Sequence, residues 1–182
     1  MTFAKTAMQQ KVSGFAILAL VCAVVLGTAC NKTNNPNYKD AVKTALEQAD
    51  LKDVRVTEDA SKNTITLGGT VHTEDAKTRA ANVAQANAGP RIIANEISVE
   101  PVGNEGEARK IESNVDDGIE SNYKAVLISK GLDKQHIRYD SKNGVLTLKG
   151  TVKSTEQRQE AQELAKNTPN VEQVVNEIQV RR

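Results

Sequence analysis

Two histidines, His72 and His136, are the first residues to consider for metal binding or proton transfer. A metal site needs a cluster of ligands at defined spacings, and the sequence contains no such cluster. Spacing alone leaves a Ser-His-Asp triad open, but no Gly-x-Ser-x-Gly motif is present to supply its nucleophile. We therefore expect solvated histidines, no metal ion and no cofactor.

Two pairs of adjacent acidic residues, Glu74-Asp75 and Asp116-Asp117, have the side chains that acid–base catalysis uses. Each pair lies where we expect a helix to begin, and the helix macrodipole stabilises negative charge there. Asp116 is also placed to cap its helix. This ordinary role explains both pairs, so the sequence predicts a protein that is not an enzyme.

The segment over 1–29 has the parts of a secretory signal. Two lysines precede an apolar run over 15–26, and small residues follow it. A run of this length is too short to span a bilayer comfortably, which favours a cleaved signal over a retained transmembrane helix. The sequence therefore predicts export of the chain.

Cys30 is the only cysteine after the predicted signal, and it follows the small residues directly. This pattern resembles a bacterial lipobox, in which the cysteine becomes lipidated, although Gly27 stands where leucine is usual. Ordinary cleavage after Ala29 is the alternative. The polar residues 30–36 predict a flexible tether, and Asn31 after the cysteine favours the outer membrane.

An internal repeat organises the rest of the chain. Shifting the sequence by 81 residues superimposes two halves without a gap, and Gly69-Thr70-Val71 then falls on Gly150-Thr151-Val152. Each half predicts a helix, two strands, a helix and a strand, with Thr73 and Ser154 as N-caps of the later helices. In the first half these elements are expected over 37–48, 55–58, 64–71, 74–87 and 92–99.

The repeat predicts two domains, over 37–101 and 115–182, joined by an interdomain linker over 102–114. The spacing of the apolar residues in this linker lets the next helix begin early, near Glu107. Strand, helix, strand implies a parallel crossover, so each domain is expected to be an α+β unit. Its three-stranded mixed sheet would carry two helices on one face.

Gly69 and Gly150 occupy the same aligned position in the two halves and are the most distinctive residues that the halves share. A phosphate-binding loop would need several glycines at the start of a helix. Here each glycine lies inside a predicted strand, where a single glycine more often marks a bulge or a close approach. We therefore interpret both as structural.

The chain resembles the BON domain family in both halves. The resemblance rests on a strand of the form Leu-x-Gly-x-Val, at 67–71 and 148–152, and on the final strand pattern at 171–180. It implies tandem binding modules of the bacterial envelope, proposed to contact phospholipid and to support outer-membrane integrity. No catalytic residues are known for the family.

The first helix of the second domain is the best candidate for a membrane contact. It has more apolar residues than one buried stripe needs, and lysines lie beside them. Packing of this helix against the first domain is an equal alternative. The expected contact residues are Tyr123, Lys124, Ile128, Lys130 and Lys134.

The leading hypothesis is a lipoprotein anchored to the outer membrane through Cys30, facing the periplasm and binding anionic phospholipid. The alternative is a protein- or peptidoglycan-interaction module, soluble in the periplasm or bound to envelope proteins. Without the two lysines of the signal the chain has 22 basic and 23 acidic side chains, which argues against nucleic acid as a partner.

Overall fold

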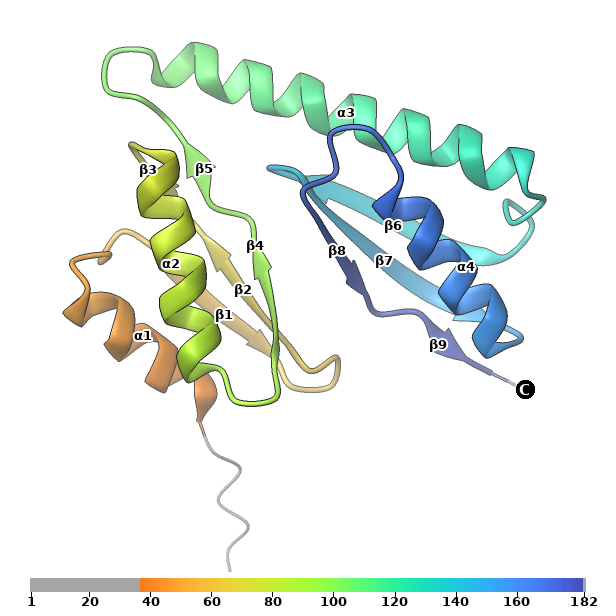
Figure 1. Ribbon diagram of the computed structural model, residues 1–182, viewed down its shortest axis with the longest axis horizontal. Coiled ribbons are helices and arrows are strands. Elements are labelled where there is room, and N and C mark those ends of the chain that lie inside the picture. Colours follow the sequence, from red (N-terminus) through yellow and green to blue (C-terminus); the bar gives the residue numbers. More distant parts are fainter. Residues whose placement is uncertain (1–36, 182) are drawn as a thin grey trace, which may run out of the picture. The chain divides into compact units, whose positions relative to one another are not determined.

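The computed structural model describes residues 37–181 (Figure 1). The predicted signal over 1–29 and the tether over 30–36, with Cys30, lie outside the described residues. Within them the chain is an α+β protein of two repeats, and each has the predicted order of elements. Each repeat is a mixed sheet with two helices, as the sequence predicts, and the last of its three predicted strands is divided into two short strands.

The sheet of the first repeat is built around β2, which pairs antiparallel with β1 and parallel with β4. Beyond Gly69 the strands β3 and β5 continue the parallel pairing, so the strand expected over 64–71 is interrupted at this glycine. The elements are α1 (Tyr38–Gln48), β1 (Arg55–Asp59), β2 (Thr64–Gly68), β3 (Thr70–Val71), α2 (Glu74–Asn87), β4 (Ile92–Asn95) and β5 (Ser98–Val99).

The sheet of the second repeat is built around β7, which is uninterrupted. It pairs antiparallel with β6 and parallel with both β8 and β9. The elements are α3 (Glu105–Ser129), β6 (His136–Lys142), β7 (Val145–Val152), α4 (Thr155–Lys166), β8 (Gln173–Asn176) and β9 (Gln179–Val180).

Aliphatic side chains fill the space between each sheet and its helices. In the first repeat, Val42 and Leu46 of α1 and the small Ala80 and Ala84 of α2 pack on the strands, and all four are buried. Small residues allow α2 to lie close to the sheet. Full burial of one Val or Leu side chain stabilises a fold by roughly 1.5–3 kcal/mol, so aliphatic packing can hold a domain that has few aromatic residues.

The N-caps of α2 and α4 explain where these helices start. Thr73 accepts a hydrogen bond from the Ala76 N–H (3.2 Å), and Ser154 accepts one from the Gln157 N–H (3.3 Å). The Gln157 side chain also accepts from the N–H of Lys153 (3.0 Å), the residue before the cap. Both predicted caps are confirmed.

Helix α3 begins at Glu105, so most of the predicted linker over 102–114 is helical. The expectation of a helix beginning near Glu107 is close to this start. The prediction that Asp116-Asp117 stands at a helix N-terminus is wrong, because this pair lies in the middle of α3. Asp116 therefore has a different role, which its contacts with the second repeat define.

Candidate functional site

The C-terminal end of α3 presents an exposed apolar residue among lysines. Ile128 is 54% exposed, and Lys124, Lys130 and Lys134, which precede and follow it in the sequence, are all exposed. No ion pair engages these three lysines within residues 37–181. Lys130 is also the C-cap of α3, where a cation complements the helix macrodipole.

Tyr123, expected at the same membrane surface, is fully buried, and that part of the prediction is wrong. It lies in the core stripe formed by Ile119, Tyr123 and Leu127, in steps of four residues. Its hydroxyl donates to the Ala161 carbonyl (3.0 Å). Its ring packs edge-on against the Tyr139 ring, with 5.2 Å between the ring centroids. Burial raises the pKa of Tyr123, which holds its hydroxyl in the neutral form.

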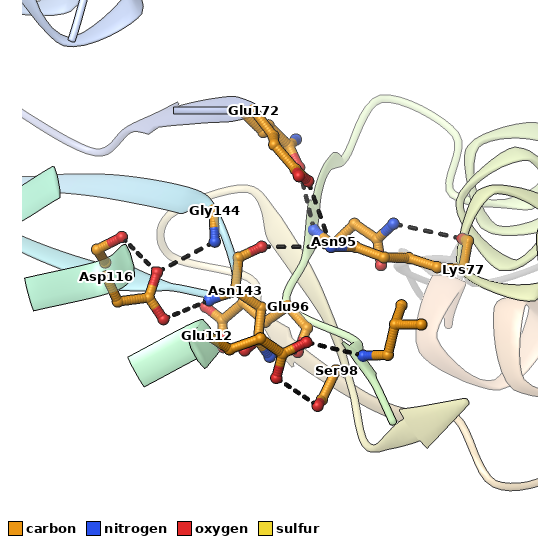
Figure 2. Close-up of polar contacts among 12 residues, drawn as sticks. Lys77, Asn95, Glu96, Ser98, Glu112, Asp116, Asn143, Gly144 and Glu172 are labelled. Carbon is orange, nitrogen blue, oxygen red and sulfur yellow. Dashed lines mark hydrogen bonds and ion pairs between the residues drawn. The ribbon is translucent and has the colours of Figure 1, made fainter. Parts of the chain in front are cut away.

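The edge strands β4 and β8 lie side by side, and the contacts around them form what we call the inter-repeat seam (Figure 1). Its buried apolar part is small: Ala94, Val145 and Val175 pack together there. Most of the seam is polar, and Figure 2 shows several of its hydrogen bonds and ion pairs. The two repeats are therefore joined by directional contacts more than by apolar area.

Lys77 is the buried cation of the seam. It lies on α2 with its side chain 11% exposed, and its amine reaches out of the first repeat. The amine donates to the Asn143 carbonyl and pairs with the Glu172 carboxylate, both at 3.3 Å (Figure 2). A groove of 360 Å³ runs beside it along β4.

Gln173 connects β8 to the outer edge of β4. Its side-chain oxygen accepts from the Asn95 N–H (3.1 Å), and its side-chain nitrogen donates to the Ile93 carbonyl. One carboxamide therefore satisfies two backbone groups that an edge strand would otherwise present unpaired.

Two further seam contacts occupy positions that are related by the 81-residue shift. Lys62 of the first repeat pairs with Glu177 of the second (3.2 Å), and Asn143 donates to the carbonyl of Glu96 (2.8 Å). The Glu177 carboxylate, followed by that of Asp59, raises the pKa of Lys62. The seam therefore has partial two-fold character, with residue i meeting j and the equivalent of i meeting the equivalent of j.

Carboxylates one turn apart on α3 hold both repeats. Glu112 accepts from the Val99 N–H (2.9 Å) and the Ser98 hydroxyl (2.6 Å) in the first repeat. Asp116 accepts from the N–H groups of Asn143 (2.8 Å) and Gly144 (3.1 Å) in the second. These acids are hydrogen-bond acceptors for strand and turn backbone, which gives Asp116 a structural role different from the predicted cap.

Gly69 and Gly150 adopt φ values of 104° and 116°, which residues with a Cβ rarely adopt. A Cβ at Gly69 would also lie 2.5 Å from the Asp53 carbonyl oxygen, and one at Gly150 would overlap the His136 carbonyl oxygen more severely. Both positions need glycine for conformation and for the close approach of the neighbouring backbone.

The two histidines lie in different repeats. His72 contacts the Glu100 carbonyl through Nδ1 (2.9 Å), and His136 is exposed at the start of β6. Within residues 37–181 no three His, Cys, Asp or Glu side chains are grouped so that they could hold a metal ion. In the same part of the chain, none of the helices has the length and apolar character needed to cross a bilayer.

The sequence does not predict the contacts of the inter-repeat seam, although one seam residue has an unusual position that indicates a contact. Lys77 stands on the stripe of α2 that also presents Ala80 and Ala84, so a lysine occupies a position of the buried face. Such a cation needs a partner from another element. Nothing local in the sequence identifies Gln173 or Glu172 as that partner, because they lie far along the chain.

Comparison with known proteins agrees with the internal repeat. The family model of the BON domain matches residues 34–101 and 115–182. No curated protein matched the sequence. Among solved structures, the chain is similar to "CdsD - The structural protein of the Type III secretion system of Chlamydia trachomatis: C-terminal domain", with 13% identity and a TM-score of 0.30. That similarity covers 76% of this chain and 62% of the other, so this chain spans less than two thirds of its length. With two family matches over more than half of its residues, the chain belongs to the BON domain family.

Proposed function

We propose that this protein is an envelope lipoprotein that is anchored through Cys30 and binds anionic phospholipid with the end of α3. BON domains are binding modules without a catalytic function. The observation that carries the proposal is the exposure of Ile128 among Lys124, Lys130 and Lys134. Such binding would help to maintain the outer membrane under stress.

The chemistry of this surface suits the headgroup region of a membrane. The segment from Lys124 to Lys134 contains three lysines and one acid, Asp133, which gives it a net charge of +2. A basic residue near an anionic membrane contributes about 1 kcal/mol, and burial of an isoleucine side chain contributes roughly 1.5–3 kcal/mol. This surface binds an anionic membrane by itself, and a lipid anchor strengthens the contact by holding the surface at the membrane.

The membrane contact is tested with the chain over 35–182, which is one compact unit, and with vesicles of phosphatidylglycerol and phosphatidylcholine. We expect Ile128→Glu to lower co-sedimentation about tenfold, because it removes an apolar contact and adds a repelled charge. Ile111→Glu is the matched control, since Ile111 is 57% exposed on the same helix. Equal losses in the two variants, or no binding by the unmodified chain at low salt, would exclude this surface.

The anchor is tested separately by the intact mass of the protein from its native host. A lipoprotein would begin at Cys30 and carry the mass of its acyl chains. A chain that begins at Cys30 without added mass would point to ordinary cleavage after Ala29 and to a protein released into the periplasm. That result would leave the vesicle measurement to decide whether the BON domains still reach the membrane.

A further inference from the structure

Strand β4 is at the edge of its sheet, next to β2. The N–H groups of Ile92 and Glu96 donate toward the β2 side, to Asn63 (2.8 Å) and Leu67 (2.9 Å). Because successive residues of a strand point to opposite sides, the backbone groups of Ile93 and Asn95 point away from β2. In the sheet order β1-β2-β4 no strand pairs with them there.

The Gln173 side chain bonds this edge in the pattern of a peptide group. In a parallel ladder, one residue donates its N–H to the carbonyl of residue j−1 and accepts from the N–H of residue j+1. Gln173 donates to Ile93 and accepts from Asn95, which flank Ala94 in this way. Its carboxamide therefore stands in for one residue of an added parallel strand.

Glu172, the residue before Gln173, supplies a charge beside the same edge of β4. Glu172 places its carboxylate on the Lys77 amine (3.3 Å), while its own side chain is 67% exposed. Of the residues from the first repeat that line the groove along β4, Lys77 alone is charged. The groove therefore combines a backbone edge with one nearly buried cation, and a segment with a carboxylate complements both.

In the described part of the chain, only the β4 edge is bonded in this way, and the aligned β8 edge is not. The 81-residue shift places Ile92 on Gln173, and an isoleucine side chain cannot bond the β8 edge in return. The shift also places Arg158 on Lys77, and the Arg158 guanidinium donates to Asn176 of its own repeat (3.5 Å). The second repeat thus provides the bonding side chains of Glu172 and Gln173, and the first repeat provides the edge strand and the cation that they bond.

We propose that the β4 edge and Lys77 form a binding site for an extended acidic segment of a partner protein, which Glu172 and Gln173 occupy when no partner is present. The partner adds to β4 as a parallel strand and places a carboxylate on Lys77, as in other cases of strand addition. The seam opens locally to admit it. This site is independent of the phospholipid surface on α3.

The test uses the chain over 35–182 and a fluorescein-labelled pentapeptide, Val-Glu-Val-Glu-Val with blocked ends. Its alternation places both carboxylates on one face of an extended strand. Fluorescence polarisation measures its affinity for the unmodified chain and for Gln173→Ala. We expect the variant to bind about tenfold tighter, because the competing carboxamide with its two hydrogen bonds is gone.

Controls distinguish binding at this site from non-specific peptide binding. Gln159→Ala removes an exposed glutamine of α4 and should bind like the unmodified chain. Lys77→Met, combined with Gln173→Ala, should return binding to the level of the unmodified chain or below it. The peptide Val-Lys-Val-Lys-Val should bind no variant. The amide signal of Asn95 should shift when the acidic peptide is added to Gln173→Ala, provided that the rest of the ¹H–¹⁵N spectrum shows the native fold.

Three outcomes would overturn the proposal. Equal affinity of the Gln173→Ala and Gln159→Ala variants would show that the carboxamide does not mask the edge. Equal binding of the acidic and basic peptides would remove the role of Lys77. Concentration-dependent dimerisation of Gln173→Ala without peptide binding would assign the edge to a second copy of the chain.

Discussion

The hairpins of the two repeats differ in register, although their sequences align without a gap. The 81-residue shift places Asp59 on Asp140, yet Asp59 faces Thr64 while Asp140 faces Thr147, two residues further along the partner strand. The first hairpin has a four-residue loop over 60–63, and the second has the two-residue turn Asn143-Gly144. The second hairpin pairs more residues as a result.

The residues at the turn explain this difference. Asn143 and Gly144 have φ values of 49° and 81°, as a tight type I′ hairpin turn requires. The aligned residues are Lys62 and Asn63, and only Asn63 has a positive φ. A lysine in the left-handed region costs about 1–2 kcal/mol, so the first hairpin forms the longer loop instead.

Side chains then stabilise each loop in a different way. Asp59 accepts from the Ser61 N–H (3.1 Å) and hydroxyl (2.6 Å) within its own loop. The Asn143-Gly144 turn is held from outside by Asp116 of α3. Because a shift of two residues keeps every side chain on its face of the sheet, duplicated hairpins can change register without disturbing the core.

The largest expected effect comes from replacing the shared glycines. Gly150→Ala should lower the free energy of unfolding by about 3 kcal/mol or more, and Gly69→Ala by about 2 kcal/mol, because both add strain at positive φ and Gly150 has the closer backbone neighbour. Urea denaturation measures both values. A smaller loss at Gly150 would mean that the uninterrupted strand β7 relaxes more easily than the broken pair β2 and β3.

A smaller effect is expected from exchanging turn residues. Asn143→Lys with Gly144→Asn gives the second hairpin the residues of the first, and it should cost about 2 kcal/mol by excluding the type I′ turn. We expect Asp140 to move from Thr147 to Val145 as its cross-strand partner. Interstrand nuclear Overhauser effects report this register, and an unchanged pattern would show that Asp116 fixes the turn regardless of its residues.

The smallest effect concerns the loop acid. The hydrogen bond from the Ser61 hydroxyl is the main reason that the pKa of Asp59 lies below its ordinary value of 3.8. A lowered pKa means that Asp59 adds stability above pH 3.8, and this contribution is lost as the pH falls through the lowered value. Ser61→Ala should raise the pKa toward 3.8 in an NMR titration of the carboxyl group, while Ser61→Thr should keep it low. A pKa that is the same in all three chains would contradict the loop geometry.

Much of each repeat could be predicted from the sequence, because the deciding information is local. The sequence predicts a helix over 74–87, and α2 occupies Glu74–Asn87, because Thr73 provides a clear cap. The burial of Tyr123 was also within reach, because Ile119 and Leu127 stand four residues away on either side. Tyr123 belongs to this buried stripe, so the number of apolar residues on the helix exceeds the number that are free to contact a membrane.

The register of the first hairpin and the seam could not be predicted. Alternation of apolar and polar residues is unchanged by a two-residue shift, so the pattern in β1 and β2 fits both registers. The seam depends on pairs such as Lys77 and Glu172, which lie 95 residues apart. Such pairs leave no periodic trace, and only the lysine on a buried helix face indicates that a contact exists.

Helix α3 constrains how this chain can change during evolution. Glu112 and Asp116 accept hydrogen bonds from different repeats at positions one helical turn apart. Both must therefore keep their orientation around the helix axis. Insertion or deletion of one residue between them would rotate one acid by about 100° away from its partners. Ordinary connectors between domains tolerate such length changes, whereas here we expect the spacing to be inherited as strictly as a core residue.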